Sequence, residues 1–233
     1  MSLDLAWQRL LVVAPHPDDE VLGCGGLIPK VKKAGGEVHV LVMTVGSIAQ
    51  YGGKSDTKVR IKELERVAKF LRFDSYYLAL PGDKYHLCLD QVPKKKLVDI
   101  IESGEKVSLS AIKPTMVCIP YLHSTNQDHV AVAEAAFTAC RPVGGKSKPI
   151  PKIVLSYEQP EISWSRAVFN PNFFVDIGSE IRTKIEALKL YSSQIRKEPH
   201  PRSAENIVRI AESRGRQVGV KAAEAFECHR LVL

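Results

Sequence analysis

The chain has 233 residues, of which 45% are hydrophobic and 25% charged, and its formal net charge is +7. These values are typical of a soluble globular protein and exclude a disordered, collagen-like or coiled-coil chain. The length, without internal repeats or low-complexity linkers, predicts one domain spanning residues 1–233. Lysines and arginines are scattered and form no stripe interleaved with aromatic residues, so we expect the positive charge to serve solubility and not nucleic-acid binding.

The opening segment, MSLDLAWQRLLVVAP, lacks the basic start of a signal peptide. Its apolar run LLVVA is too short to span a membrane and is better interpreted as a buried strand. We therefore expect a cytoplasmic protein without a membrane span. The cysteines are odd in number, widely spaced and without a C-x-x-C pair, which argues against a disulfide framework or a thiolate zinc site.

Short apolar runs alternate with amphipathic segments along the whole chain. Strands are predicted at 10–15, 38–45, 76–80, 115–120, 152–156 and 173–177, and the run HRLVL closes the chain. Helices are predicted at 20–34, 57–71, 92–106, 128–140, 179–192 and 203–218. This alternation predicts an α/β fold with a mainly parallel sheet and helices on both faces. In such folds ligands bind beyond the carboxyl ends of the strands.

The segment PHPDDE, residues 15–20, follows the first predicted strand directly. His16 and Asp19 are three residues apart across a tight turn, so both side chains can converge on one ion. Zinc accepts histidine nitrogen and carboxylate oxygen, and a catalytic site has three protein ligands plus water. Asp18 then points elsewhere and is free to act as a base toward that water. The alternative is that the acidic residues only favour the positive end of a helix dipole.

A third ligand is available after the strand that ends at Pro120. His129 begins the following helix, next to Asp128. Asp128 can accept the second ring proton of His129, an arrangement that is recurrent around metal-bound imidazoles. It can also cap the helix, and the two roles are compatible.

The sequence resembles the LmbE/PIG-L-type zinc-dependent de-N-acetylases. The motif APHPDDEVLGCGG and the distant Asp-His pair carry the resemblance, and Arg60, Glu63 and the run NQDHVAV support it. The C-terminal segments PNFFVD, PHPRS and AEAF resemble a bacterial subgroup associated with carbohydrate modification. The resemblance implies a Rossmann-like domain that binds zinc through His16, Asp19 and His129. Two histidines and a carboxylate also suit Fe²⁺.

The reaction implied by the resemblance is hydrolysis of an N-acetyl group on a sugar or sugar-like substrate. A zinc-bound water is the nucleophile, the metal polarises the amide carbonyl, and Asp18 is the general base. Many relatives have a histidine three residues before the last ligand, where this chain has Asn126. An amide can donate a hydrogen bond to an oxyanion but cannot serve as a general acid. The acid is therefore His200, His123 or the protonated Asp18, and His200 is preferred.

Three further residues are expected to bind the substrate: Arg60, His123 and Arg202. For Arg60, a contact with a carboxylate beside the ligands and a position on the solvated face of its charged helix are the alternatives. His39 and His86 match no motif and are expected to be incidental. The loops at 46–56, 82–90 and 141–168 are expected to set specificity. Assembly into a homo-oligomer stays open.

Three other functions fit parts of the sequence. A dinucleotide-binding oxidoreductase is disfavoured because Gly23-Cys24-Gly25-Gly26 does not match G-x-G-x-x-G and the preceding acidic residues would repel pyrophosphate. A metal-dependent amidase acting on a non-sugar N-acyl compound stays open. A binding module of the same fold without turnover also stays open, although the intact set of metal-ligating residues argues against it.

Overall fold

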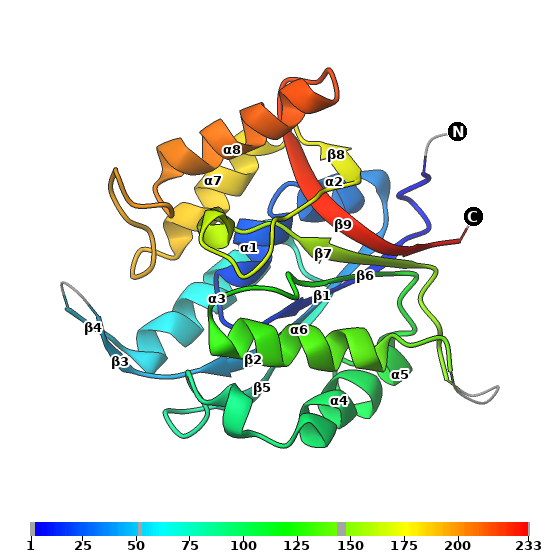
Figure 1. Cartoon of the computed structure of the whole chain (residues 1–233), viewed down its shortest axis with the longest axis vertical. Helices are drawn as coiled ribbons and strands as arrows, with labels where there is room; N and C mark the ends of the chain where they lie inside the picture. The colour runs from blue at the N-terminus through cyan, green and yellow to red at the C-terminus, as the bar shows by residue number, and fades with distance from the viewer. Residues whose placement is uncertain (1–2, 51–52, 144–147, 233) are drawn as a thin grey trace.

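A seven-stranded sheet forms the centre of the computed structural model, which describes residues 3–50, 53–143 and 148–232 (Figure 1). Its strands, in the order β5-β2-β1-β6-β7-β9-β8, are β5 Ser75–Pro81, β2 Glu37–Val45, β1 Arg9–Ala14, β6 Met116–Pro120, β7 Ile153–Tyr157, β9 Ala223–Leu231 and β8 Phe173–Asp176. The strands from β5 to β7 pair in parallel, and β9 pairs antiparallel with both β7 and β8. The predicted mainly parallel α/β sheet is therefore confirmed.

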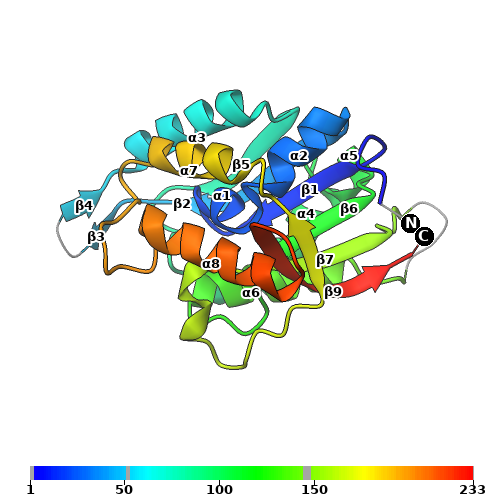
Figure 2. The ribbon, with the colours of Figure 1, turned by 90° about the horizontal axis from the view of Figure 1, so that it is seen from above.

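Helices cover both faces of the sheet, as predicted (Figure 2). One face packs against α1 Asp19–Cys24, α2 Leu27–Ala34, α3 Thr57–Leu71, α7 Ile181–Leu190 and α8 Ala204–Gln217. The other packs against α4 Lys94–Ser103, α5 Leu109–Ile112 and α6 Gln127–Ala139. Two short 3₁₀ turns, η1 Leu89–Gln91 and η2 Pro160–Ser163, and a hairpin of β3 Ile48–Gln50 with β4 Gly53–Ser55 complete the elements.

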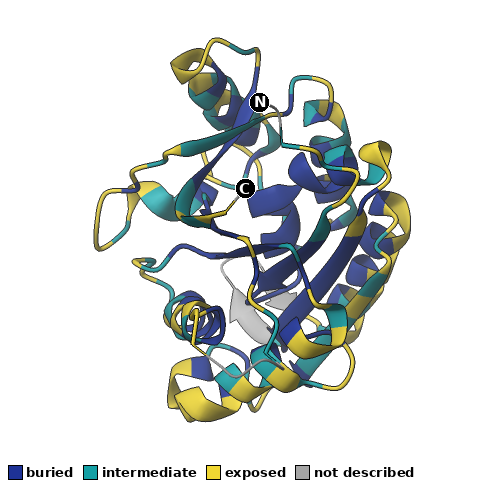
Figure 3. Ribbon diagram, turned by 90° about the vertical axis from the view of Figure 1, so that its right-hand side faces the viewer, coloured by how far each residue is buried: buried dark blue, intermediate teal, exposed yellow. Residues whose placement is uncertain are grey.

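The apolar run in β1 contributes side chains to two hydrophobic cores, one on each face of the sheet. Side chains alternate across a strand, so Leu10 and Val12 enter one core while Leu11 and Val13 enter the other. All four are fully buried. Figure 3 shows the central strands of the sheet in the colour of buried residues, with exposed residues on the outer surfaces of the helices and in the loops. Strands buried on both faces contain continuous hydrophobic runs, which is why β1 shows no polar alternation.

The predicted helix at 20–34 is wrong in its continuity, because α1 and α2 are separate helices that meet at Gly25 and Gly26. The Glu224 carboxylate accepts hydrogen bonds from the backbone nitrogens of Gly26 (2.8 Å) and Leu27 (2.7 Å) at the start of α2. A Cβ at Gly26 would lie 2.4 Å from Ile177, so only glycine allows this close approach. The break is therefore fixed by β9 and Ile177, which are distant in sequence.

Other differences from the predicted elements concern the C-terminal half of the chain and the loop at 46–56. The last strand, β9, begins at Ala223 and not at His229, and it inserts between β7 and β8. The hairpin of β3 and β4 lies within the segment predicted to be a loop. Among the described residues no helix is long and apolar enough to cross a membrane.

Candidate active site

Because the strands from β5 to β7 run in the same direction, the segments that follow them meet at one edge of the sheet. His16 and Gln159 lie in the loops after β1 and β7, and His129 lies in the first turn of α6, which follows β6. The strands β1, β6 and β7 are neighbours in the sheet. The chain passes from β1 to β2 on one side, while β6 lies on the other side of β1. Ligand sites of open α/β sheets lie at this kind of reversal of strand order.

Three predicted metal ligands converge at this edge. One ligand atom each from His16, Asp19 and His129 can be chosen so that all lie within 4.8 Å of one another. Asp19 Oδ2 is 3.4 Å from His16 Nδ1 and 3.3 Å from His129 Nε2. The three residues are buried. The sequence prediction that a strand-end loop and a helix start would meet therefore agrees with the geometry.

Asp128 fixes the ring of His16 and not that of His129. Its Oδ2 lies 2.8 Å from His16 Nε2, and it also accepts hydrogen bonds from the backbone nitrogens of Leu87 and Leu89, both at 2.8 Å. Consecutive residues of a helix point in different directions, so Asp128 cannot face the ring of its neighbour His129. The expected Asp128–His129 pairing was wrong for this reason. The expected cap was also wrong, because the side chain that caps α6 belongs to Asn126.

The partner of His129 is Gln159, which the sequence analysis did not identify. Gln159 Oε1 lies 2.7 Å from His129 Nδ1, and Gln159 Nε2 donates to Asp19 Oδ1 at 2.6 Å. Because the carboxylate can only accept, the amide NH₂ faces Asp19 and the amide oxygen faces His129. A polar residue just beyond the end of β7 was the available signal, since ligand-binding residues gather at strand ends.

These hydrogen bonds leave one nitrogen of each histidine for a cation. Nε2 of His16 and Nδ1 of His129 are engaged, so His16 Nδ1 and His129 Nε2 face Asp19. His129 Nε2 is buried without a hydrogen-bond partner. A buried polar atom without a partner is costly, and a metal ion would satisfy it. The donor set of two imidazoles and one carboxylate, with oriented rings, therefore fits zinc.

The surroundings favour the protonation states that a metal needs at His129 and Asp19, but not at His16. Burial lowers the pKa of His129, which keeps its ring neutral. Although burial opposes ionisation of Asp19, the neighbouring His129 and His16 hold its pKa below the ordinary value. Although burial also opposes a charged His16, its hydrogen bonds with Asp128 and Asp19 raise its pKa. Metal binding would displace a proton from this ring.

Asp18 adopts a backbone conformation that is unusual for a residue with a side chain. Its φ is 112°, in the left-handed region. It occupies the N-cap position of α1, yet its side chain makes no capping hydrogen bond. Instead its Oδ2 accepts a hydrogen bond from Arg202 Nη1 at 3.0 Å, and its Oδ1 lies 3.7 Å from Arg60 Nη2. A strained backbone conformation of this kind persists where the surrounding structure imposes it. Here it accompanies a carboxylate that contacts arginine side chains and not the backbone of α1.

Burial raises the pKa of Asp18 to about 6, while Arg202 opposes that rise, as does Arg60. Arg60 is buried and donates to the Pro17 carbonyl at 2.8 Å, although it comes from a helix rich in charged residues. Glu20 supports the same turn: its Oε2 accepts from the Asp18 backbone nitrogen at 3.1 Å, and its Oε1 accepts from Tyr191 at 2.5 Å. Burial raises the pKa of Glu20 to about 8.

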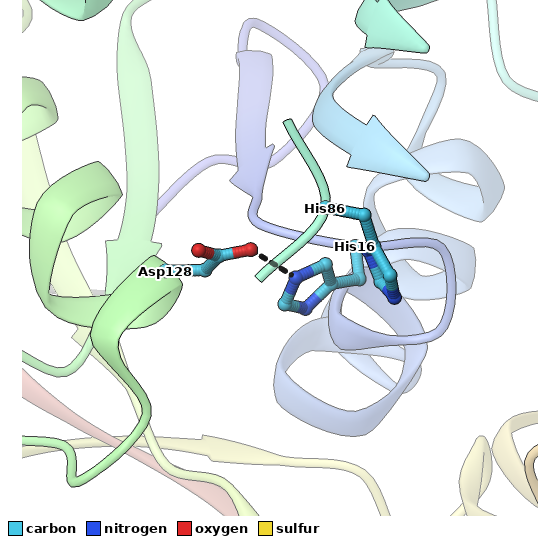
Figure 4. Close-up of side chains that lie close together, drawn as sticks. All are labelled: His16, His86 and Asp128. Carbon is cyan, nitrogen blue, oxygen red and sulfur yellow. Dashed lines mark hydrogen bonds and ion pairs between the residues drawn. The ribbon is translucent and has the colours of Figure 1, made fainter. Parts of the chain in front are cut away.

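His86 was expected to be incidental, but it lies against the site. Its ring packs edge-on against His16, with centroids 5.0 Å apart and planes at 82° (Figure 4). Figure 4 also shows the contact between Asp128 and His16 beside it. His86 is buried, its Nδ1 has no hydrogen-bond partner, and burial lowers its pKa to about 4. A Cβ at Gly46 would lie 2.4 Å from that of His86, so the loop after β2 fixes its position. His39, by contrast, lies in β2 and contacts Ser75.

A cavity of about 260 Å³ opens beside the cluster, and we call it the metal-side cavity. Its walls include His129, Gln159, Asn126 and Arg202. Asn126 Oδ1 accepts a hydrogen bond from the Asp128 backbone nitrogen at 2.9 Å. Arg202 also donates to Glu161, another wall residue that the sequence analysis did not identify.

Two residues that the sequence analysis associated with the site lie outside these walls. His123 is exposed and packs against the ring of Tyr121, with centroids 5.4 Å apart. His200 is exposed as well, and its Nδ1 accepts a hydrogen bond from the Arg202 backbone nitrogen at 3.0 Å. His200 is thus placed behind Arg202, and its catalytic role and that of His123 stay predictions.

Comparisons with known proteins agree with this geometry. The chain is 30% identical over 186 residues to the uncharacterised deacetylase YaiS of Escherichia coli, covering 79% of this chain and 90% of that one. It is 24% identical over 196 residues to a diacetylchitobiose deacetylase of Thermococcus kodakarensis, covering 80% and 70% of the two chains. The crystal structure of the conserved protein TT1542 of Thermus thermophilus superposes with a TM-score of 0.74 at 28% identity, covering 97% and 96%.

A family model gives the assignment directly. The model described as PIG-L, GlcNAc-PI de-N-acetylase, matches residues 11–140, a span that contains the three candidate metal ligands. The chain therefore belongs to the PIG-L family of de-N-acetylases, as its strand-end motifs indicated.

Proposed function

We propose that this protein is a metal-dependent hydrolase that removes the acetyl group from the nitrogen of an N-acetylated sugar or sugar-like compound. The observation that carries the proposal is the buried convergence of His16, Asp19 and His129 beside an open cavity, with one nitrogen of each ring directed to the carboxylate. The deacetylase names of the relatives support the reaction.

The metal would be held by His16 Nδ1, Asp19 Oδ2 and His129 Nε2. We favour zinc, and Fe²⁺ is the alternative with the same donor preference. When bound, the metal would polarise the amide carbonyl and lower the pKa of a water molecule. Asp128 and Gln159 orient the two imidazole rings through the hydrogen bonds described above.

Asp18 is the general base of this proposal. Its carboxylate lies beside the ligands but is not one of them, and its pKa of about 6 makes it more basic than an exposed aspartate. It is still ionised at neutral pH, so it can take the proton of the attacking water. Arg60 and Arg202 hold its carboxylate in place with contacts to different oxygens.

The remaining residues act on the substrate. The NH₂ group of Asn126 can donate to the negative charge that develops on the amide oxygen, because the Asn126 side-chain oxygen is already engaged at the start of α6. Arg202 borders the cavity and can also contact substrate oxygens. We assign protonation of the leaving amine to Asp18 after it has gained its proton. His200, which was the preferred acid from sequence, would act by supporting Arg202.

The test measures metal content and acetate release together. The purified protein, supplied with zinc, is compared with His129→Ala and with the control His229→Ala, which changes an exposed histidine that contacts Ser156 and Phe137. We expect about one zinc per chain, held by His16, Asp19 and His129, and acetate release from N-acetylated sugars. Both should be lost in His129→Ala and kept in His229→Ala.

Two outcomes would contradict parts of the proposal. Metal binding without acetate release from any N-acetylated sugar would shift the substrate to another N-acyl compound. Absence of metal binding even with zinc supplied would refute the hydrolytic mechanism and favour a binding module of the same fold.

A further inference from the structure

A second group of metal-ligating side chains lies beside the candidate ligands and shares His16 with them. One ligand atom each from His16, His86 and Asp128 can be chosen so that all three lie within 4.8 Å of one another. The candidate ligands His16, Asp19 and His129 meet the same limit. We call His16, His86 and Asp128 the second cluster, and Figure 4 shows its side chains. His86 has no part in the proposed hydrolysis, so the second cluster needs an explanation of its own.

The backbone around His86 is held against the start of α6. The backbone nitrogens of Leu87 and Leu89 donate to the Asp128 carboxylate, both at 2.8 Å. Gln127 Nε2 donates to the Leu87 carbonyl at 2.9 Å. Leu87 has a φ of 57°, a left-handed conformation that is uncommon for a residue with a side chain. The surrounding contacts therefore impose the conformation of the segment that carries His86.

The ring of His86 is buried and only partly satisfied. The residue is 8% exposed, and its Nδ1 has no hydrogen-bond partner among the residues that the structure describes. Its edge-on packing brings the ring close to His16 without a hydrogen bond between the two rings. A buried polar atom without a partner is costly, and ligation of a cation would give Nδ1 the partner that it lacks.

Asp128 and His16 supply the other two donors of the second cluster. The Asp128 carboxylate accepts three hydrogen bonds, and its two oxygens offer about four positions, so one position is left for a cation. His16 Nε2 donates its proton to Asp128 Oδ2 at 2.8 Å. A cation would replace that proton, while His16 Nδ1 stays directed to Asp19. Two cations can therefore share the His16 ring, one on each nitrogen.

The spacing of the donor atoms indicates which cation is held more tightly. Two donors of a tetrahedral zinc ion lie about 3.3 Å apart. Asp19 Oδ2 already has this distance to His16 Nδ1 (3.4 Å) and to His129 Nε2 (3.3 Å). The 2.8 Å between His16 Nε2 and Asp128 Oδ2 would have to widen by about 0.5 Å. We therefore expect the second cation to bind more weakly and to be lost when free zinc is removed, so that the purified protein keeps one.

We propose that His16, His86 and Asp128 form a second site for a divalent transition-metal cation, joined to the first site through the His16 ring. Two imidazole nitrogens and one carboxylate oxygen suit Zn²⁺ and related cations, whereas Mg²⁺ and Ca²⁺ prefer oxygen ligands alone. This inference goes beyond the proposed function, because the second site is defined by binding and is filled without substrate.

The test counts the zinc ions bound to the initially metal-free protein at equilibrium. Wild type, His86→Phe, His39→Phe and His129→Ala are dialysed against a series of buffered Zn²⁺ concentrations, and bound zinc is measured by atomic absorption. Phenylalanine keeps a ring beside His16 but removes both nitrogens of His86. His39 is the matched control, because it is also 8% exposed but lies in β2 and contacts Ser75. Thermal unfolding of the metal-free proteins shows whether each variant is folded.

We expect the wild type and His39→Phe to bind one zinc tightly and a second at higher concentration. His86→Phe should keep the tight zinc and raise the dissociation constant of the second by at least about 100-fold, because two protein donors remain where zinc sites use three or four. His129→Ala should lose the tight zinc and keep the weaker one, since it removes no donor of the second cluster.

Two results would overturn the second site while leaving the first intact. One is a wild type that binds a single zinc over the whole concentration series, and the other is a folded His86→Phe protein that still binds two. A wild type whose only zinc is weak and depends on His86 would instead support the second site and refute the metal site of the proposed function.

Discussion

The contact of Gln159 with two candidate ligands makes a quantitative prediction. Gln159→Met keeps a side chain of similar length but removes the hydrogen bonds to Asp19 (2.6 Å) and His129 (2.7 Å). Loss of the partner that orients a metal-bound histidine weakens metal binding or activity by about 10–100-fold. This corresponds to about 1.4–2.8 kcal/mol of binding free energy. It also leaves the His129 Nδ1 hydrogen buried and without an acceptor.

The assay is competition for zinc between the protein and a chromophoric chelator. Wild type, Gln159→Met and the control Gln194→Met are compared, since Gln194 is also buried but donates to Ser193 and not to a ligand. Circular dichroism of the metal-free proteins checks that each variant is folded. A folded Gln159→Met protein with the zinc affinity of the wild type would refute the reasoning that Gln159 holds the ligands in place.

Three further predictions follow from single contacts. Asp18→Asn should retain zinc but lower kcat for acetate release by about 10²–10⁴-fold, because the amide cannot take a proton; metal analysis and steady-state kinetics on one preparation check this. Glu224→Gln should lower the free energy of unfolding by about 3 kcal/mol, since it leaves the buried Lys184 ammonium without the carboxylate 2.6 Å away, and urea denaturation measures the change. Burial opposes ionisation of Asp74, but its hydrogen bond with Lys32 lowers the pKa of Asp74 from 3.8 in the folded protein. The ionised Asp74 side chain therefore contributes its full stabilisation above the pKa of the unfolded state. This stabilisation is lost as the pH falls through the lower pKa of the folded state. As the pH falls through this acid range, the free energy of unfolding should therefore decrease less for Asp74→Asn than for the wild type. Equal decreases in the two proteins would show that the contact of Asp74 with Lys32 does not contribute this pH dependence.

The sequence contained enough information to predict the sheet and the place where His16, Asp19 and His129 meet. Both depend on short-range patterns: apolar runs identify the strands, and parallel strands place their carboxyl ends together. His16, Asp19 and His129 each follow such a run or begin a helix. These regularities need no knowledge of which distant residues touch, and they are therefore visible in a single sequence.

The partners of the ligands could not be predicted in the same way. Gln159 is 140 residues from Asp19, and nothing local indicates their contact. Asp128 was assigned to its sequence neighbour, whereas the helix directs it to His16, 112 residues away. Arg60 belongs to a charged helix whose default position is at the surface, yet it is buried against Pro17. Each of these contacts depends on tertiary packing that periodicity does not encode.

The hydrogen bonds between Glu224 and the start of α2 have a consequence for the order in which the candidate metal site can form during synthesis. All three candidate ligands lie within residues 11–140, so they are synthesised before Gln159 and Glu224. Gln159, which orients His129, and Glu224, which holds the break between α1 and α2, emerge later. A nascent chain therefore contains the three candidate ligands before it contains the residues that hold them in position. We expect metal loading to follow completion of β9.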